Sequence, residues 1–223
     1  MAASARRRWP GLVERLNQSD FVRAVADWAG GIPSGARRVL AIAAPPGGGK
    51  STLAEQLVSR LPNGAAAILP MDGFHYDDEV LIPRGHRPRK GAPHTFDVGG
   101  FAALLRRLRD NAEDEIAVPR FDRDLEISRG AARIVPRDVR LIVAEGNYLL
   151  LDQEPWASLR PLYDRAAFLD VPEAEVTRRL RARWEGYGMD EAGIRAKLEE
   201  NDLPNARLVI EQSVAPDWVV GTD

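Results

Sequence analysis

One segment, from Ala44 to Thr52, limits most strongly what this chain can fold into. It reads Ala-Pro-Pro-Gly-Gly-Gly-Lys-Ser-Thr and fits the pattern G-x-x-x-x-G-K-[ST], with Ala44 in the place of the first glycine. A glycine-rich loop of this kind points successive backbone N–H groups at a polyphosphate. The helix that follows adds the partial positive charge of its N-terminus. The segment therefore predicts a phosphate-binding loop.

The neighbouring residues support this interpretation. Val39–Ala43 is a short uncharged run typical of a buried strand, and leucines recur at helical spacing after the loop. Lys50 is expected to reach the β- and γ-phosphates, and the Ser51 hydroxyl to hold Mg²⁺. The chain uses arginine almost everywhere, yet a lysine stands here, and a compact ammonium fits inside a phosphate cradle better than a planar guanidinium. The predicted nucleotide-binding residues are Pro46, Gly47, Gly48, Gly49, Lys50, Ser51 and Thr52.

Length and charge bound the class of protein. The 223 residues, 44% hydrophobic, are enough for one domain with a real core. A net charge of -2 gives no general attraction to nucleic acid or to an anionic membrane. The absence of cysteine excludes disulfides and thiolate metal sites. Arg6–Arg8 precede no apolar export segment, and no uncharged stretch approaches the length of a membrane span. We expect a cytoplasmic protein with no membrane insertion.

Alternating strands and helices predict an α/β fold, a three-layer P-loop NTPase with a mainly parallel central sheet and helices on both faces. We expect a single domain over residues 1–223, with a helix in residues 1–35 packed on the core and a lid at about 172–200. The expected strands are 39–43, 65–69, 116–118, 140–144, 166–171 and 218–220. The expected helices are 11–29, from the loop to about 61, 98–109, 172–184, 190–198 and 204–212. Residues 71–96 read as one long functional loop.

Two carboxylates follow predicted strands and so belong at the ligand-binding edge of a parallel sheet. Glu145 ends the apolar run Leu141–Ala144 and is a candidate Mg²⁺ partner. Asp72 follows the strand that ends at Leu69; it is a candidate for accepting the proton of a substrate hydroxyl and a second candidate metal partner. Whether Asp72 or Glu145 is the base stays open, and either can be an ordinary turn residue. His75 is a candidate substrate contact.

Two charged clusters remain. One predicted helix carries four arginines that include candidates for closing over the phosphates, and Arg178 and Arg183 are assigned as catalytic. Others among them belong to a solvated cationic face. The run Pro119–Asp124 holds Phe121 and Arg123, candidate acceptor contacts, or is a charged turn. The four arginines are Arg178, Arg179, Arg181 and Arg183.

A GTPase switch protein is the nearest competitor. The residues Asp97-Val98-Gly99-Gly100 fit D-x-x-G, but no strand is predicted before them. No N-K-x-D follows anywhere in the chain, so guanine specificity has no support. The loop type excludes a Rossmann oxidoreductase.

Several motifs in this order resemble the phosphoribulokinase/uridine kinase/pantothenate kinase family, and within it the bacterial nucleoside/nucleotide kinase-like or fructose transport system kinases. The resemblance spans about Val39 to Val220 and implies ATP- and Mg²⁺-dependent phosphoryl transfer to a small-molecule hydroxyl. It matches Asp72 and Glu145 to the acidic residues of the family and makes Tyr148 a candidate substrate contact. Gly73 replaces a serine of the uridine kinase pattern, which favours pantothenate-like or sugar acceptors. Besides the phosphate loop and the Arg-rich helix, the motifs are Asp72–His75, Gly91–Asp97, Phe121–Arg123 and Glu145–Leu149.

The sequence thus predicts an ATP-dependent kinase of a sugar, pantothenate-like or nucleoside acceptor. The alternative is an ATP-binding regulatory or transport-associated protein without an acceptor. The identity of the acceptor and the oligomeric state, with a homodimer as one option, stay open.

Overall fold

The structure is a computed structural model that describes Trp9 and residues 13–221. Within this part of the chain, six strands form one sheet in the order β1-β8-β7-β2-β6-β3, and all neighbours in it are parallel. A separate antiparallel hairpin pairs β4 with β5. The strands are β1 (Glu14–Leu16), β2 (Arg38–Ala43), β3 (Ala66–Pro70), β4 (Glu115–Asp122), β5 (Ile127–Pro136), β6 (Leu141–Gly146), β7 (Arg165–Asp170) and β8 (Trp218–Gly221).

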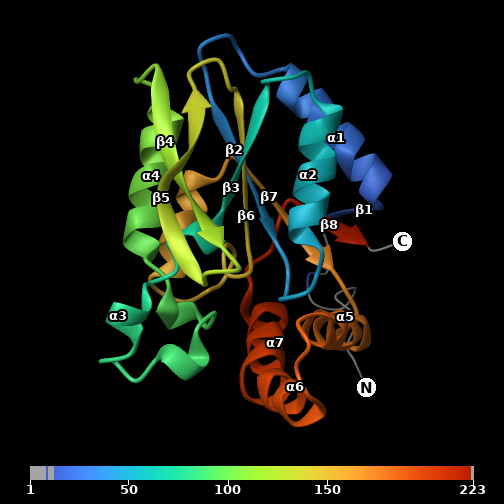
Figure 1. Ribbon diagram of the computed structural model, residues 1–223. Coiled ribbons are helices and arrows are strands. Elements are labelled where there is room, and N and C mark those ends of the chain that lie inside the picture. Colours follow the sequence, from blue (N-terminus) through green and yellow to red (C-terminus); the bar gives the residue numbers. More distant parts are fainter. Residues whose placement is uncertain (1–8, 10–12, 222–223) are drawn as a thin grey trace.

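Helices cover both faces of the sheet, which gives the three expected layers (Figure 1). On one side lie α1 and α2, on the other α4 with the hairpin, while α5, α6 and α7 gather at the end where β2 runs into α2. The helices are α1 (Gln18–Gly30), α2 (Lys50–Arg60), α3 (Asp78–Leu81), α4 (Val98–Asp110), α5 (Glu173–Gly186), α6 (Glu191–Lys197) and α7 (Leu203–Gln212). The 3₁₀ turns are Met71–Phe74, Arg87–Arg89, Pro93–Thr95 and Trp156–Leu162, and a π-helical turn spans Leu198–Asp202.

Each face of the sheet has its own hydrophobic core, because successive side chains of a strand point to opposite faces. In β2, Val39 and Ala41 pack on the side of α4, while Leu40 and Ile42 pack on the side of α1 and α2. All of these side chains are fully buried. Both cores therefore fix β2, and with it the loop that leaves its carboxyl end.

The first predicted helix is shorter than expected. Residues 11 and 12 lie outside the described part of the chain, and Glu14–Leu16 form a parallel edge strand beside β8. The helix begins at Gln18 because the Asn17 side chain accepts a hydrogen bond of 2.8 Å from the backbone N–H of Asp20. Within the described part of the chain, no helix is long and apolar enough to cross a bilayer.

The hairpin is the largest element that the sequence did not predict. Only its residues 116–118 were expected as a strand, and β5 was not expected at all. Most of β5 is exposed, so its residues lack the alternation of apolar and polar side chains that marks a half-buried strand. The segment 71–96 is likewise not one plain loop, since it contains α3 and three 3₁₀ turns.

Candidate active site

The phosphate loop has the backbone of an anion-binding turn. Gly47 and Gly49 have φ angles of 72° and 92°, a left-handed conformation that glycine adopts without steric cost. Gly49 precedes the first residue of α2, and no side chain caps this helix end. The backbone N–H groups of its first turn are therefore free to bind a ligand. All seven predicted loop residues line one cleft, a cavity of about 580 Å³.

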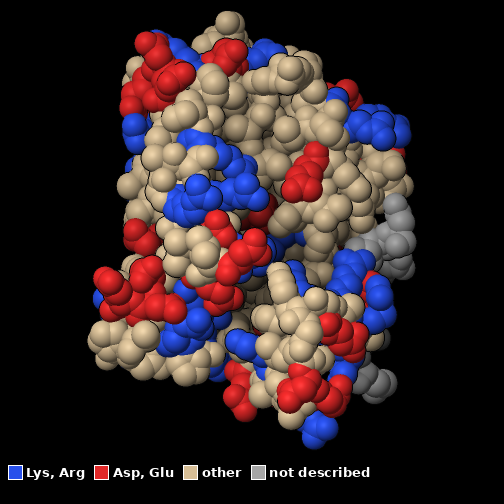
Figure 2. All heavy atoms as spheres, in the orientation of Figure 1, with Lys and Arg blue, Asp and Glu red and all other residues tan. Residues whose placement is uncertain are grey.

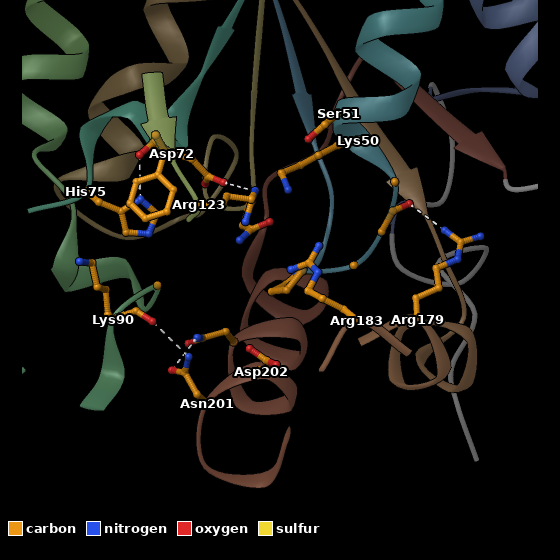
Figure 3. A pocket seen from close by; sticks show the side chains of 18 of the residues that line it. Lys50, Ser51, Asp72, His75, Lys90, Arg123, Arg179, Arg183, Asn201 and Asp202 are labelled. Atoms are coloured by element: carbon orange, nitrogen blue, oxygen red, sulfur yellow. Dashed lines mark hydrogen bonds and ion pairs between the residues drawn. The ribbon is translucent and has the colours of Figure 1, made fainter. Parts of the chain in front are cut away.

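Figure 2 shows this cleft as a hollow near the centre of the face, with acidic and basic side chains around it. In Figure 3, Ser51, Lys50, Arg179 and Arg183 lie on one side, and Asp72, His75, Arg123 and Lys90 on the other. We call the first group the lid side and the second group the acceptor side. The lid side also includes Trp184 and Lys197, which line the cleft. The labelled residues of the lid side come from α2 and α5. Those of the acceptor side come from the segments that follow β3 and β4.

Glu145 lies at the centre of the sheet, opposite the loop. Its register partner in β2 is Ile42, so the two strands deliver it beside α2. Ser51 Oγ donates a 3.1 Å hydrogen bond to Glu145 Oε1, and Lys50 Nζ lies 3.9 Å from Oε2. Burial raises the pKa of Glu145, although the positive charge of Lys50 acts to lower it. A hydroxyl and a carboxylate at a phosphate site are the hard oxygen ligands that suit Mg²⁺.

Asp72 lies in the 3₁₀ turn directly after β3. Its carboxylate accepts a 2.8 Å hydrogen bond from Arg123 Nη2, which reaches it from beyond β4. Burial opposes ionisation of Asp72, but nearby positive charge, chiefly that of Lys50 and also that of Arg123, outweighs it, so its pKa lies below the ordinary value. The two carboxyls thus differ, because their surroundings lower the pKa of Asp72 and raise that of Glu145.

His75 is fixed against Asp72 and two aromatic rings. Its Nδ1 lies 2.8 Å from the backbone carbonyl oxygen of Asp72. The ring centroids of Phe96 and Phe121 lie 4.1 and 4.5 Å from that of the imidazole. Burial in this stack, reinforced by Lys90 and Arg123, lowers the pKa of His75 and keeps the ring neutral. His75 and Phe121 both line the cleft, on its acceptor side.

The arginines of α5 point in two directions. Arg183 lines the cleft, and Arg179, one helical turn away, donates to the Gly48 carbonyl oxygen at 3.2 Å. Arg178 instead pairs with Glu175 at 2.7 Å, has a side chain 69% exposed and is absent from the lining of the cleft. Arg181 pairs with Glu191 on the outside. The structure thus places Arg183 at the cleft as expected but not Arg178, and Arg179, four residues before Arg183, reaches the loop instead.

Tyr148 does not line the cleft either. Its side chain is fully buried, and its hydroxyl donates a 2.6 Å hydrogen bond to the Gly91 carbonyl oxygen. It holds the segment before α4 against the end of β6 rather than contacting a substrate. Asp97, whose motif suggested a GTPase, caps α4 by accepting from the N–H of Gly100 at 2.8 Å.

Several residues of the cleft were not predicted as site residues. Asn201 accepts a hydrogen bond from Arg89 and donates to the Lys90 carbonyl oxygen, so it ties the π-helical turn to the acceptor side. The Asp202 side chain accepts from Trp184 Nε1 at 2.7 Å. Only the lysines offered a signal, because Lys50, Lys90 and Lys197 are the only ones in the chain and all line this cleft. The polar and aromatic residues of the lining that were not assigned to the site include Arg87, Lys90, Asn147, Arg179, Trp184, Lys197, Asn201 and Asp202.

A parallel sheet of this order, with a phosphate loop, an adjacent acidic residue and a basic helix across the cleft, defines a P-loop nucleotide-binding protein. No family model matches the chain. It is 36% identical to the uncharacterized Escherichia coli protein YggC over 82% of this chain and 77% of that protein. It is 33% identical to a Schizosaccharomyces pombe protein described as a candidate uridine kinase, over 82% and 83% of the two chains.

A solved structure agrees with these relatives. A protein described as a candidate fructose transport system kinase from Silicibacter sp. TM1040 superposes with a TM-score of 0.84 at 35% identity, over 92% of this chain and 98% of that one. The chain belongs to the phosphoribulokinase/uridine kinase/pantothenate kinase family of P-loop kinases. Membership supports a phosphotransferase that uses ATP.

Proposed function

We propose that this protein transfers the γ-phosphate of Mg²⁺-ATP to a hydroxyl of a small-molecule acceptor. The observation that carries the proposal is that the Asp72 carboxylate and the loop residue Lys50 line one cleft from opposite sides (Figure 3). The lid side would hold the nucleotide, and the acceptor side the alcohol. Phosphoryl transfer asks a protein chiefly for positioning and for neutralisation of charge, and both are available here.

The roles follow from the geometry. Backbone N–H groups of the loop and the α2 N-terminus bind the phosphates, and Lys50 neutralises their charge. Arg183 comes from α5 and has no carboxylate within 4.0 Å in the described part of the chain, so its charge is available to the transferred group. We propose that α5 and α6 act as the lid.

Asp72 orients the acceptor hydroxyl and accepts its proton as the new O–P bond forms. The bond between the γ-phosphorus and the β–γ bridging oxygen breaks, and ADP leaves with its electron pair. Glu145 accepts the hydrogen bond of Ser51 and lies 3.9 Å from Lys50, the residues of the phosphate loop, so we assign the base to Asp72. Ser51, Glu145 and Asp72 would hold Mg²⁺, which neutralises phosphate charge when bound.

The test is ADP production from Mg²⁺-ATP by the full chain, with and without candidate sugars, nucleosides and pantothenate. We expect one compound class to stimulate ADP release, with mass spectrometry showing that the compound has gained a phosphoryl group. ATP binding without stimulation by any compound would favour the alternative, an ATP-binding regulatory or transport-associated protein.

A further inference from the structure

The acceptor side of the cleft has chemistry that narrows the class of substrate. We infer that the acceptor is a small uncharged polyhydroxyl compound, a sugar or polyol, whose O–H groups bind to the ring edge of His75 and the side-chain amide of Asn147. This inference rests on the proposed kinase function. It excludes nucleosides and acids such as pantothenate, which the sequence alone leaves open.

The aromatic rings of the acceptor side are already in use. The rings of Phe96 and Phe121 both pack against the imidazole of His75, with centroids 4.1 and 4.5 Å from its own. The Phe121 ring also has Lys90 Nζ over it, 5.9 Å from its centroid. Phe96 is only 4% exposed. A nucleobase gains its binding energy largely by stacking on an aromatic face, and these rings are already engaged with His75 and Lys90.

The cations of the acceptor side are also paired. Arg87 lies 2.6 Å from an oxygen of Asp78, and Lys90 lies 2.7 Å from the other oxygen of the same carboxylate. Arg123 is held by Asp72 at 2.8 Å. An acceptor with a carboxylate or phosphate would have to displace one of these partners. Among the described cations of the cleft, those with no carboxylate within 4.0 Å are Arg183 and Lys197, both on the lid side.

What remains on the acceptor side are neutral hydrogen-bonding groups. A carbonyl oxygen only accepts, so the 2.8 Å contact with Asp72 O places the proton of His75 on Nδ1 and leaves the lone pair on Nε2. Oδ1 of Asn147 is buried and has no hydrogen-bond partner in the described part of the chain. The Asn147 amide therefore lines the cleft without being held by another residue of the described chain. Both residues line the cleft, as Asp72 does.

Asn147 lies close to Asp72 because of the glycine before it. A Cβ on Gly146 would come within 2.4 Å of Met71, the residue that precedes Asp72. The end of β6 therefore packs directly on the turn that holds the proposed base. His75 and the Asn147 amide border the same cleft as Asp72, and a compound with several neighbouring hydroxyl groups, each of which can donate and accept, suits such neutral groups.

A second cavity beside the cleft contains charges that could bind a phosphorylated acceptor. Arg120 and Arg133 line a second cavity of about 310 Å³, which also borders Asp72 and Glu145. Neither has a carboxylate within 4.0 Å among the described residues, so a phosphorylated sugar that reached into this cavity could find charge there. The experiment therefore includes phosphorylated sugars as a separate group of compounds.

The first experiment measures acceptor-stimulated ADP release for three groups: neutral sugars and polyols, anionic compounds (sugar phosphates, pantothenate and hydroxy acids), and nucleosides. We expect stimulation by the neutral group alone. Stimulation by nucleosides or by anionic compounds, with none by neutral ones, would overturn this inference and leave the kinase proposal standing. Stimulation by no compound would overturn both.

The second experiment uses variants with the neutral acceptor so identified. Asn147→Ala and His75→Phe should each raise KM for the acceptor by roughly 2- to 10-fold, the loss of one hydrogen bond, and leave KM for ATP unchanged. His75→Phe keeps an aromatic ring in the stack. His94→Ala is the matched control, because His94 packs on His86 outside this cleft. An unchanged acceptor KM in both variants, or an equal rise in the control, would contradict the inference.

Discussion

Arg123 Nη2 lies 2.8 Å from Asp72 Oδ2, so a residue just beyond β4 holds a carboxylate just beyond β3. The two residues are 51 positions apart in the chain and meet because the hairpin, which lies on the same face of the sheet as α4, contacts the turn after β3 (Figure 1). Arg123 adds to the larger effect of Lys50 in lowering the pKa of Asp72 against its burial, and both Asp72 and Arg123 line the cleft. Predictions about the proposed reaction start from this carboxylate.

Asp72→Asn should leave ATP affinity nearly unchanged and lower turnover by roughly 10²–10⁴, the usual range for a positioned base. The amide keeps the shape but takes up no proton. Calorimetry measures ATP affinity, and an assay with the identified acceptor measures turnover. Asp114→Asn is the control, because the Asp114 side chain is exposed. If neither quantity changes, Asp72 is only a turn residue. If ATP affinity collapses as well, Asp72 is chiefly a metal partner.

Lys50→Met should lower turnover by roughly 10²–10³, the loss expected when one charge is withdrawn from a transition state. The Lys50 side chain is only 11% exposed, so methionine, which has a similar length, fills the space better than alanine. Thermal unfolding should show a folded protein. Full activity in the folded variant would show that the loop does not hold the transferred phosphate.

Arg183→Ala and Arg178→Ala form a matched pair on one helix. Arg183 lines the cleft, while Arg178 pairs with Glu175 on the exposed side of α5. We expect turnover to fall by roughly 10²–10³ in Arg183→Ala and to stay within about twofold in Arg178→Ala. Equal losses in the two variants, measured at saturating ATP and acceptor, would refute the orientation of this helix.

Gly146→Ala should destabilise the protein by roughly 1–3 kcal/mol, as overpacking of a buried site does. Its Cβ would meet Met71 at 2.4 Å, and Met71 cannot move without moving Asp72. Turnover should therefore fall together with stability, as urea unfolding and activity measured in parallel would reveal. A stable variant with full turnover would show that β6 and the turn after β3 adjust independently.

Competition binding should show that the protein prefers ATP and has no strong selectivity for GTP. No N-K-x-D motif is present in the chain, and Asp97 of the D-x-x-G segment caps α4 instead of lining the cleft. Mant-labelled ATP displaced by unlabelled ATP and GTP gives both affinities on one preparation. Tight binding of GTP alone would reverse this interpretation.

Patterns within a few residues predicted much of this fold. The glycines before Lys50, the apolar run 39–43 and the helical leucines placed the loop between β2 and α2. The strands ending near Glu145 and before Asp72 were predicted from the same kind of local signal, and their ends meet at one edge because parallel strands share direction. The exposed strand β5 lacked such a signal, since no buried face imposes alternation on it.

The sequence by itself determined the phosphate loop, the α/β alternation and the kind of chemistry that Lys50, Asp72 and Glu145 offer. These depend on backbone preferences and side-chain chemistry that act over a few residues. Only the tertiary structure decided which long side chains share the cleft, turning Arg183 inward, Arg178 outward and Tyr148 into the core. The physical reason is that such contacts depend on how separate elements pack, and residues far apart in the chain carry no local mark of their partners.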